Sequence, residues 1–237
     1  MELLEQIDFE IELKDPKYFY NNKPVPRVTS ILSAMLNKDY LLRWANSLGW
    51  KRKSHEKERD LAAEIGTYVH NSIEQYMVNG IELDIERIPT QYRFKVLNGY
   101  NSFKLWWSKI TSSNNIEIVA CEKELVCPWY GGTCDFIIKI NGRYFLGDFK
   151  TSNNVSYEYF LQLAAYRNIL RLENIELSGC IILQVDKNEV AFEEFVLLFE
   201  QPDHYQFIEH CFATFNSLVY AYYNRLEAER QFKNIFK

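Results

Sequence analysis

The sequence predicts a mixed α/β (α+β) fold, in which helices flank a central mixed sheet and the N-terminal part is mainly helical. Apolar residues recur at three- and four-residue steps over residues 56–79 and 89–109, as on the buried face of a helix. Residues 116–150 contain strand-like alternation and a hairpin signal, and residues 179–185 form the apolar run expected of a strand covered on both faces.

A chain of 237 residues suits one large domain. We expect residues 1–112 to form the mainly helical part and residues 113–237 to form an αβββαβ-type core with a final helix. With 47% apolar and 16% aromatic residues, the chain can bury a substantial core, which excludes the disordered class. The net charge of −5 argues against a protein that holds nucleic acid by bulk positive charge. Local charges and bound cations would have to do that work.

The cysteines and the N-terminus indicate a cytoplasmic protein. The five cysteines are scattered with no C-x-x-C pair, and an odd number without a signal peptide fits reduced thiols. The first residues, Met1-Glu2-Leu3-Leu4-Glu5, are acidic and lack signal-peptide character. No apolar run approaches the roughly 18 residues of a membrane span, so we expect no membrane partner.

A predicted hairpin brings two carboxylates together. Asn141-Gly142 is the strongest short hairpin signal, and a two-residue loop there places Asp135 opposite Asp148. Opposed residues have Cβ atoms roughly 4.5–5.5 Å apart, so the two acids would share a proton or hold a cation. Lys150 projects from the same face as Asp148. The alternative is a surface ion pair between Asp148 and Lys150, with Asp135 solvated.

The helix predicted over 56–79 carries a candidate histidine ligand. His70 lies beside the apolar stripe, with Gly66 and Glu74 one turn away on either side. A histidine in this position is often a hydrogen-bonded core residue. Gly66, however, leaves room for an ion or another backbone, and neutral imidazole is a common ligand for Mn²⁺-class metals. Glu74 could orient His70 or hold a metal-bound water, or it could be an ordinary exposed helix charge.

The first core strand, over residues 116–126, carries two glutamates. Alternation predicts that Glu122 and Glu124 point one way, while Cys121, Lys123 and Leu125 point the other. The pattern does not say which glutamate lies nearer the paired acids.

The most basic run is Lys51-Arg52-Lys53, at the start of the histidine-bearing helix. It could contact phosphates or be a solvated helix end.

Four motifs follow one another along the chain, and they are Gly66-x-x-x-His70, Gly132-x-x-Asp135, Asp148-x-Lys150 and Gln162-x-x-x-Tyr166. Together and in this order they resemble the PD-(D/E)XK nuclease superfamily, and specifically its RecB-like exonuclease branch. That branch includes recombination and repair nucleases, mitochondrial genome maintenance exonucleases and many phage proteins. The resemblance implies a restriction-endonuclease-like core. Asp148 stands where a glutamate is more frequent in the family.

The resemblance also implies a site for Mg²⁺ or Mn²⁺, as one or two ions. Its ligands would be Asp135, Asp148, His70 and the carbonyl of Phe149. Lys150 would hold the attacking water or stabilise the transition state. Some relatives carry an iron–sulfur cluster on four cysteines, but the cysteine spacing here does not match, so no such cluster is expected.

Further roles follow from the same resemblance. Gln162 would position the water or the scissile phosphate, and Tyr166 and Thr151 would contact the DNA backbone. Relatives often have a glutamate of the first core strand near the metal, which here would be Glu122 or Glu124.

The expected function is a divalent-metal-dependent DNA exonuclease acting at single-stranded or frayed ends. It would serve phage or bacterial replication, repair or recombination, in the cytoplasm of a bacterium or a phage-infected host, with replication or recombination partners that the sequence does not identify. The alternatives are a non-catalytic DNA-end-binding recombination accessory protein and a structure-specific endonuclease of the same fold.

Overall fold

A five-stranded sheet forms the centre of the protein. The computed structural model describes residues 4–7, 11–13, 15–36, 45–48, 50–52 and 54–236. The strands, in spatial order, are β3 (Ile116–Val126), β4 (Gly131–Ile140), β5 (Arg143–Lys150), β6 (Gly179–Val185) and β7 (Phe192–Leu198). Neighbouring strands are antiparallel except β5 and β6, which are parallel. The predicted mixed sheet is therefore confirmed.

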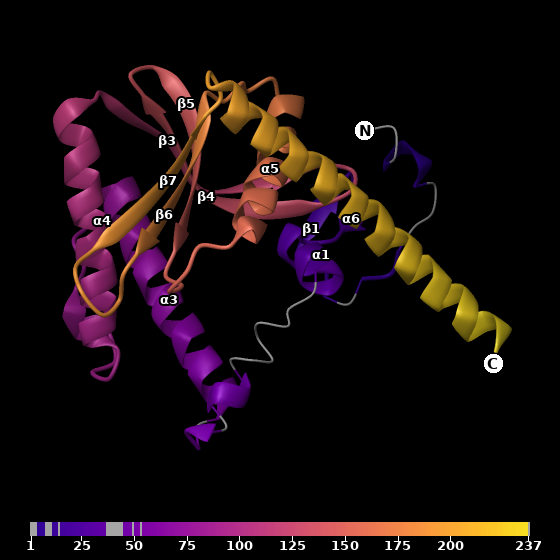
Figure 1. Cartoon of the computed structure of the whole chain (residues 1–237), viewed down its shortest axis with the longest axis horizontal. Helices are drawn as coiled ribbons and strands as arrows, with labels where there is room; N and C mark the ends of the chain where they lie inside the picture. The colour runs from indigo at the N-terminus through magenta and orange to yellow at the C-terminus, as the bar shows by residue number, and fades with distance from the viewer. Residues whose placement is uncertain are drawn as a thin grey trace.

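Helices flank this sheet on both sides (Figure 1), which confirms the predicted mixed α/β class. On one side lie α3 (His55–Asn79) and α4 (Arg93–Ser113). On the other lie α5 (Tyr157–Leu172) and the long α6 (Pro202–Ile235), with α1 (Val28–Met35) packed against both. The described helical residues also include 45–48 and two single-turn 3-10 helices, η1 (Leu4–Gln6) and η2 (Ile85–Arg87). Helix α5 is the crossover that the parallel β5–β6 pair requires.

Each face of the sheet has its own hydrophobic core. Phe103 of α4 packs on one face with Phe149 of β5, and Phe215 of α6 belongs to the core on the other face. Strand β6 serves both cores, because Ile181 faces the first and its neighbour Ile182 faces the second. This double burial explains the apolar run predicted as a strand covered on both faces.

Helix α3 is defined by its caps and its apolar stripe. The hydroxyl of Ser54 accepts a hydrogen bond from the Lys57 amide at 3.4 Å, and Gly80 ends the helix in the left-handed conformation with φ 66°. Of the stripe predicted from the sequence, Ile65, Val69 and Ile73 are buried and Leu61 and Tyr76 are half-buried, and Met77 is buried beside them. The helix therefore presents one fixed face to the sheet.

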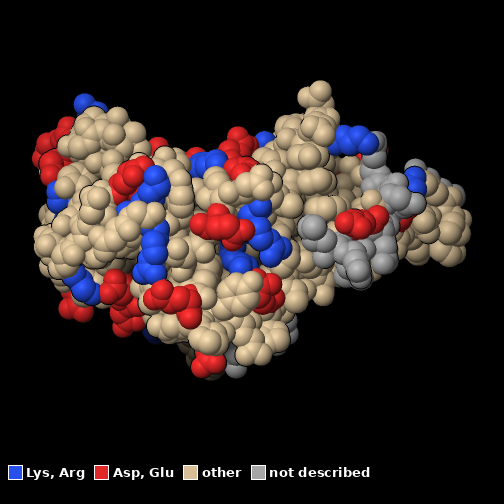
Figure 2. Space-filling view, turned by 90° about the horizontal axis from the view of Figure 1, so that it is seen from above, with Lys and Arg blue, Asp and Glu red and all other residues tan. Residues whose placement is uncertain are grey.

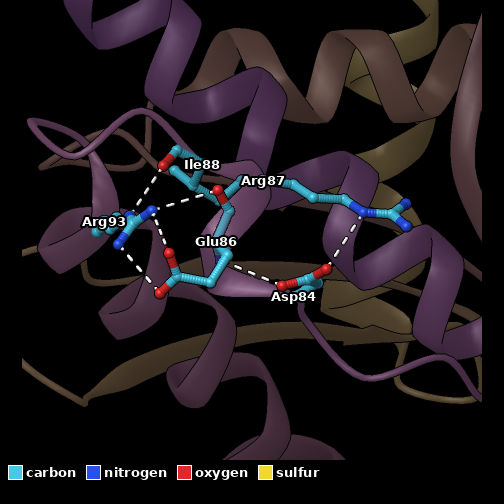
Figure 3. A network of polar contacts seen from close by, with 5 residues as sticks. All are labelled: Asp84, Glu86, Arg87, Ile88 and Arg93. Carbon is cyan, nitrogen blue, oxygen red and sulfur yellow. Dashed lines mark hydrogen bonds and ion pairs between the residues drawn. The ribbon is translucent and has the colours of Figure 1, made fainter.

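A polar network holds the segment that joins α3 to α4 (Figure 3). Arg93 donates hydrogen bonds to the Glu86 carboxylate, to the Glu86 carbonyl and to the Ile88 carbonyl. Asp84 caps η2 by accepting from the Glu86 amide at 3.1 Å and pairs with Arg87 at 3.2 Å. Arg93 is also the first residue of α4, which begins later than the predicted 89–109 because residues 89–92 form a turn.

A small hairpin from the N-terminal part packs on the main sheet. Strands β1 (Tyr18–Tyr20) and β2 (Lys23–Val25) are joined by Asn21-Asn22, both with positive φ, as a tight two-residue turn requires. The chain after β2 runs beside β4, where the Gly131 amide donates to the Pro26 carbonyl at 3.0 Å.

Charges of both signs are mixed on the surface. Figure 2 shows basic and acidic side chains interleaved over the face of the molecule that it presents. No helix among the described residues has both the length and the apolar character needed to cross a bilayer.

Candidate metal centre

Three side chains from three elements converge beside β4. The ligating atoms of His70 on α3, Glu122 on β3 and Asp135 on β4 all lie within 4.8 Å of one another. Nδ1 of His70 is 3.6 Å from Oδ2 of Asp135, which is longer than a hydrogen bond. An imidazole nitrogen and two carboxylates form a donor set that suits a divalent ion of the Mg²⁺ or Mn²⁺ class.

The predicted hairpin register places Asp135 at this point. The ladder pairs Ile140 with Arg143 and continues to Phe136 opposite Gly147, one step before Asp135. The side chain of Asp135 then reaches across to β5, where its Oδ2 accepts a hydrogen bond from the Phe149 amide at 2.6 Å. Burial and the charge of Asp148 raise the pKa of Asp135 well above its ordinary value. The protein thus disfavours a second negative charge here unless a cation accompanies it.

Asp148 lies in a different set of contacts. It is 2% exposed and forms an ion pair with Lys150, while its Oδ1 accepts from Nε2 of Gln162 at 3.3 Å. Within the described part of the chain, Oδ2 accepts no hydrogen bond, and its polar contact is the ion pair. Burial alone would lower the pKa of Lys150, but the charges of Asp148 and Asp135 outweigh burial and raise it. The raised pKa favours the ammonium form of Lys150, and the surface-pair alternative does not fit this burial.

His70 is held as a neutral base. Burial lowers its pKa, and the charge of Asp148 opposes this effect only in part. The ring meets Phe149 edge to face at a centroid distance of 6.0 Å, which fixes its plane. A neutral, oriented imidazole is the form that binds metal.

Gly66 explains how α3 comes this close to the sheet. A Cβ on Gly66 would stand 3.1 Å from Oγ1 of Thr151, the residue that follows β5. The space that the sequence predicted beside His70 is thus occupied by Thr151, whose side chain is half-buried between α3 and β5. Glu74, one turn beyond His70, is half-buried, and its charge raises the pKa of Glu122.

Strand β3 selects Glu122 over Glu124 through an irregular backbone. The register shifts between Ile118 and Ala120, and Glu122 itself has φ 47°, which is rare for a residue with a side chain. Both glutamates are exposed, but Glu122 joins the converging group and Glu124 lies outside it. Partial burial and the charge of Glu74 raise the pKa of Glu122.

The predicted alternation along β3 is wrong at this irregularity. Cys121 packs on the α3–α4 side, whereas Leu125 is buried on the α5–α6 side and Lys123 pairs with Glu173 just beyond α5. Cys121 therefore does not share a face with Lys123 and Leu125, because the left-handed residue between them turns the strand.

Helix α5 contributes Gln162 and Tyr166 to the contacts around Asp148. Nε2 of Gln162 donates to the hydroxyl of Tyr166 at 3.3 Å as well as to Asp148. Tyr166 packs on β4 so closely that a Cβ on Gly132 would stand 2.4 Å from its hydroxyl. Tyr166 is buried, so this position suits the orientation of Gln162 better than the predicted contact with a DNA backbone.

The basic run precedes the N-terminal end of α3, far from His70. Lys51 and Arg52 are exposed just before the helix, and Lys53 lies outside the described residues. From His55 to His70, a rise of about 1.5 Å per residue gives ~22 Å along the axis.

Two residues that the sequence did not single out border the site from β1. The hydroxyl of Tyr18 lies 2.9 Å from Oγ1 of Thr133, two residues before Asp135. Lys17 is close enough to counter in part the upward shift in the pKa of Glu122. No local pattern marks these contacts, because they join segments 115 residues apart.

Comparisons with known proteins leave the family open. No family model matches the chain. No curated protein matches it. A solved structure described as "Crystal structure of SSO0001" covers 92% of this chain and 82% of its own, at 14% identity and a TM-score of 0.32. A likeness at that level carries no argument, so the case for function rests on the geometry of the site and on the four motifs.

Proposed function

We propose that this chain is a divalent-metal-dependent deoxyribonuclease that acts as an exonuclease on single-stranded or frayed DNA ends. The observation that carries the proposal is the convergence of His70, Glu122 and Asp135 within 4.8 Å, next to the ion pair of Asp148 and Lys150. The order of the four motifs supports it independently. The expected setting is replication, repair or recombination of phage or bacterial DNA.

His70, Glu122 and Asp135 would hold Mg²⁺ or Mn²⁺, and Asp148 adjoins them with its Oδ2 in the ion pair with Lys150. The donor set fits such an ion, since it combines hard oxygens with one neutral nitrogen. When bound, the ion would polarise a phosphate and lower the pKa of a water molecule. The raised pKa values of Asp135 and Glu122 are a second sign that the group lacks positive charge.

Lys150 would act at the phosphate as a fixed positive charge. Its raised pKa keeps it protonated, and its Nζ lies over the Tyr159 ring at 4.5 Å, which limits its movement. A compact ammonium in a buried site stabilises the negative charge that develops on phosphate oxygens during hydrolysis.

Gln162 would orient the attacking water. An amide NH₂ has two donors, and here Nε2 contacts Asp148 and Tyr166. The carbonyl oxygen is left to accept a hydrogen bond from water. Tyr166 keeps the amide in this orientation, so it acts on water only through Gln162.

End-labelled DNA tests the proposal directly. Linear and circular substrates, each single- or double-stranded, are incubated with Mg²⁺, Mn²⁺ or EDTA, with the Asp135→Asn protein as the matched control. We expect metal-dependent shortening of linear single strands from the labelled or unlabelled end, and intact circles. Cleaved circles would instead establish an endonuclease. Binding to ends with no cleavage under any metal would establish the non-catalytic alternative.

A further inference from the structure

The β1–β2 hairpin is fixed next to the metal centre by one buried tyrosine. Tyr18 is 4% exposed, and its hydroxyl lies 2.9 Å from Oγ1 of Thr133 on β4. Gly131 permits the close approach, since a Cβ there would stand 2.8 Å from Cβ of Tyr18. Arg27, after β2, forms a parallel bridge with the same glycine. These contacts fix the hairpin against β4 at Gly131 and Thr133, and Thr133 is two residues before Asp135.

The residues that follow this anchor are large exposed aromatics. Phe19 is 54% exposed and Tyr20 is 38% exposed, on opposite sides of a three-residue strand. At about 3.3 Å per residue, both lie within roughly 7 Å of Tyr18 along the strand. Single exposed apolar residues are ordinary on protein surfaces. Phe19 and Tyr20 thus place one exposed ring on each side of a hairpin that is packed against the candidate metal centre, and an exposed ring suits a flat ligand.

Basic side chains flank the aromatic pair. Lys17 immediately precedes Tyr18, and its Nζ lies 5.3 Å from the centroid of that ring. Arg27 is exposed on the β4 side of the hairpin. The combination of aromatic rings and cations beside a cluster of acids matches the surface of a nucleic-acid strand, in which flat bases alternate with phosphates.

We propose that the β1–β2 hairpin binds the single-stranded segment of the substrate as it approaches the metal centre, with Phe19 and Tyr20 stacking on bases and Lys17 and Arg27 contacting phosphates. This inference rests on the proposed nuclease function and names the element that selects single strands. Bases in a duplex are stacked on one another and do not offer their faces to side chains, whereas bases of a single strand do. Every base can stack on an aromatic ring, so this binding would not depend on the nucleotide sequence.

The test compares binding by the Phe19→Ala/Tyr20→Ala protein with binding by the wild type. Fluorescence anisotropy is measured in Ca²⁺ on a phosphorothioate single strand, on the same strand carrying abasic sites, and on a blunt duplex. We expect the double variant to bind the single strand at least ~5- to 150-fold more weakly, the range that the loss of a single base–aromatic contact implies. Duplex binding should be unchanged, and the difference between the two proteins should disappear on the abasic strand.

A matched control removes two exposed apolar side chains from α4 instead. Phe94 is 66% exposed and Leu97 is 41% exposed, so the Phe94→Ala/Leu97→Ala protein loses a similar surface and should bind as the wild type does. Circular dichroism and a Mn²⁺ titration confirm that each variant is folded with an intact metal centre.

The remaining outcomes distinguish the hairpin from the function. Unchanged single-strand affinity in the Phe19→Ala/Tyr20→Ala protein overturns the hairpin inference and leaves the nuclease proposal standing. Equal losses on single strand and duplex overturn the assignment to single strands. A wild type that binds no nucleic acid with any metal overturns both proposals, and the hairpin surface would then fit a protein partner.

Discussion

The two halves of the candidate metal centre differ in how completely their polar and charged side chains are paired with one another. In the half built by β5 and α5, Asp148 contacts Lys150 and Gln162, and Gln162 contacts Tyr166. In the half built by α3, β3 and β4, the ligating atoms of His70, Glu122 and Asp135 are close, but two carboxyl groups have raised pKa values. In the first half the charged and polar groups are paired with one another, whereas in the second half the nearby Lys17 and Lys150 do not fully offset the shifts of the carboxyl pKa values.

Under the proposed function, this difference gives each half its own task. A network that is already neutralised by its own lysine is preorganised, so it can position water and phosphate without rearrangement. A group of acids and a neutral histidine gains free energy when a cation binds, because the cation relieves their mutual repulsion. Asp148 touches both halves, since its charge also raises the pKa of Asp135.

The largest expected effects come from substitutions of the two aspartates, because Asp135 lies in one half of the site and Asp148 in the other. Asp135→Asn and Asp148→Asn should each reduce cleavage by ~10³-fold or more, because each removes a charge from the site. Their metal-free stabilities should move in opposite directions. Asp148→Asn leaves Lys150 buried without its ion pair and should cost about 3–5 kcal/mol. Asp135→Asn removes a repelled carboxylate and should stabilise by ~0.5–1 kcal/mol. Chemical denaturation in EDTA measures both, and changes of the same sign would contradict the division.

The two glutamates of β3 give the sharpest matched pair for the metal-binding half. Glu122→Gln should weaken Mn²⁺ binding ~10- to 100-fold, because it removes one charged donor from the convergent group. Glu124→Gln is the same substitution two residues away, on a side chain that is equally exposed but outside the convergent group, and should leave the affinity within ~2-fold. Calorimetric titration with Mn²⁺ compares them. Equal losses would mean that the left-handed backbone at Glu122 does not select the ligand.

His70 tests whether α3 belongs to the metal-binding half or only packs against it. His70→Ala should lower Mn²⁺ affinity and cleavage together, with added Mn²⁺ partly restoring the rate. The side chain is 27% exposed, so free imidazole should also reach the space and rescue cleavage in part. A core histidine would behave differently. The variant would melt early, and its Mn²⁺ affinity per folded molecule would equal that of the wild type.

Much of this centre could be predicted from local patterns. A two-residue turn at Asn141-Gly142 determines the pairing of β4 with β5, so the position of Asp135 followed from register alone. Helical spacing likewise placed Gly66 and His70 on one face of α3. The ladder of a hairpin and the period of a helix are properties of short segments, so short segments suffice to predict them.

The features that were missed depend on contacts between distant segments. Glu122 enters the site because the backbone of β3 turns left-handed, which alternation does not anticipate. The burial of Tyr166 depends on its packing over Gly132, more than thirty residues earlier in the chain. Tyr18 reaches Thr133 across 115 residues. Such contacts are determined by tertiary packing, so residue spacing did not reveal them.

The pH dependence of stability without metal should reveal the uncompensated carboxyl groups in the half built by α3, β3 and β4. The raised pKa of Asp135 means that the folded protein binds this proton more tightly than the unfolded chain does. Stability should therefore fall as pH rises from about 4, the unfolded value, to the raised folded value. The lowered pKa of His70 acts oppositely, adding stability as pH rises towards about 6.5. Melting temperatures in EDTA should show a steeper fall for the wild type than for Asp135→Asn, and identical profiles would contradict this.

The smallest expected effect concerns the basic run at the far end of α3. Lys51 and Arg52 are exposed, and ~22 Å of helix separates His55 from His70, so a strand would have to be several nucleotides long to reach them. Lys51→Ala/Arg52→Ala should weaken binding of a long single strand in Ca²⁺ and reduce the salt slope by about 0.7 for each lost phosphate contact. Cleavage of a strand of only a few nucleotides should be unchanged, because neither half of the centre is touched. If affinity and salt slope on long strands also stay the same, the run is a solvated helix end and the strand must leave the centre along another face.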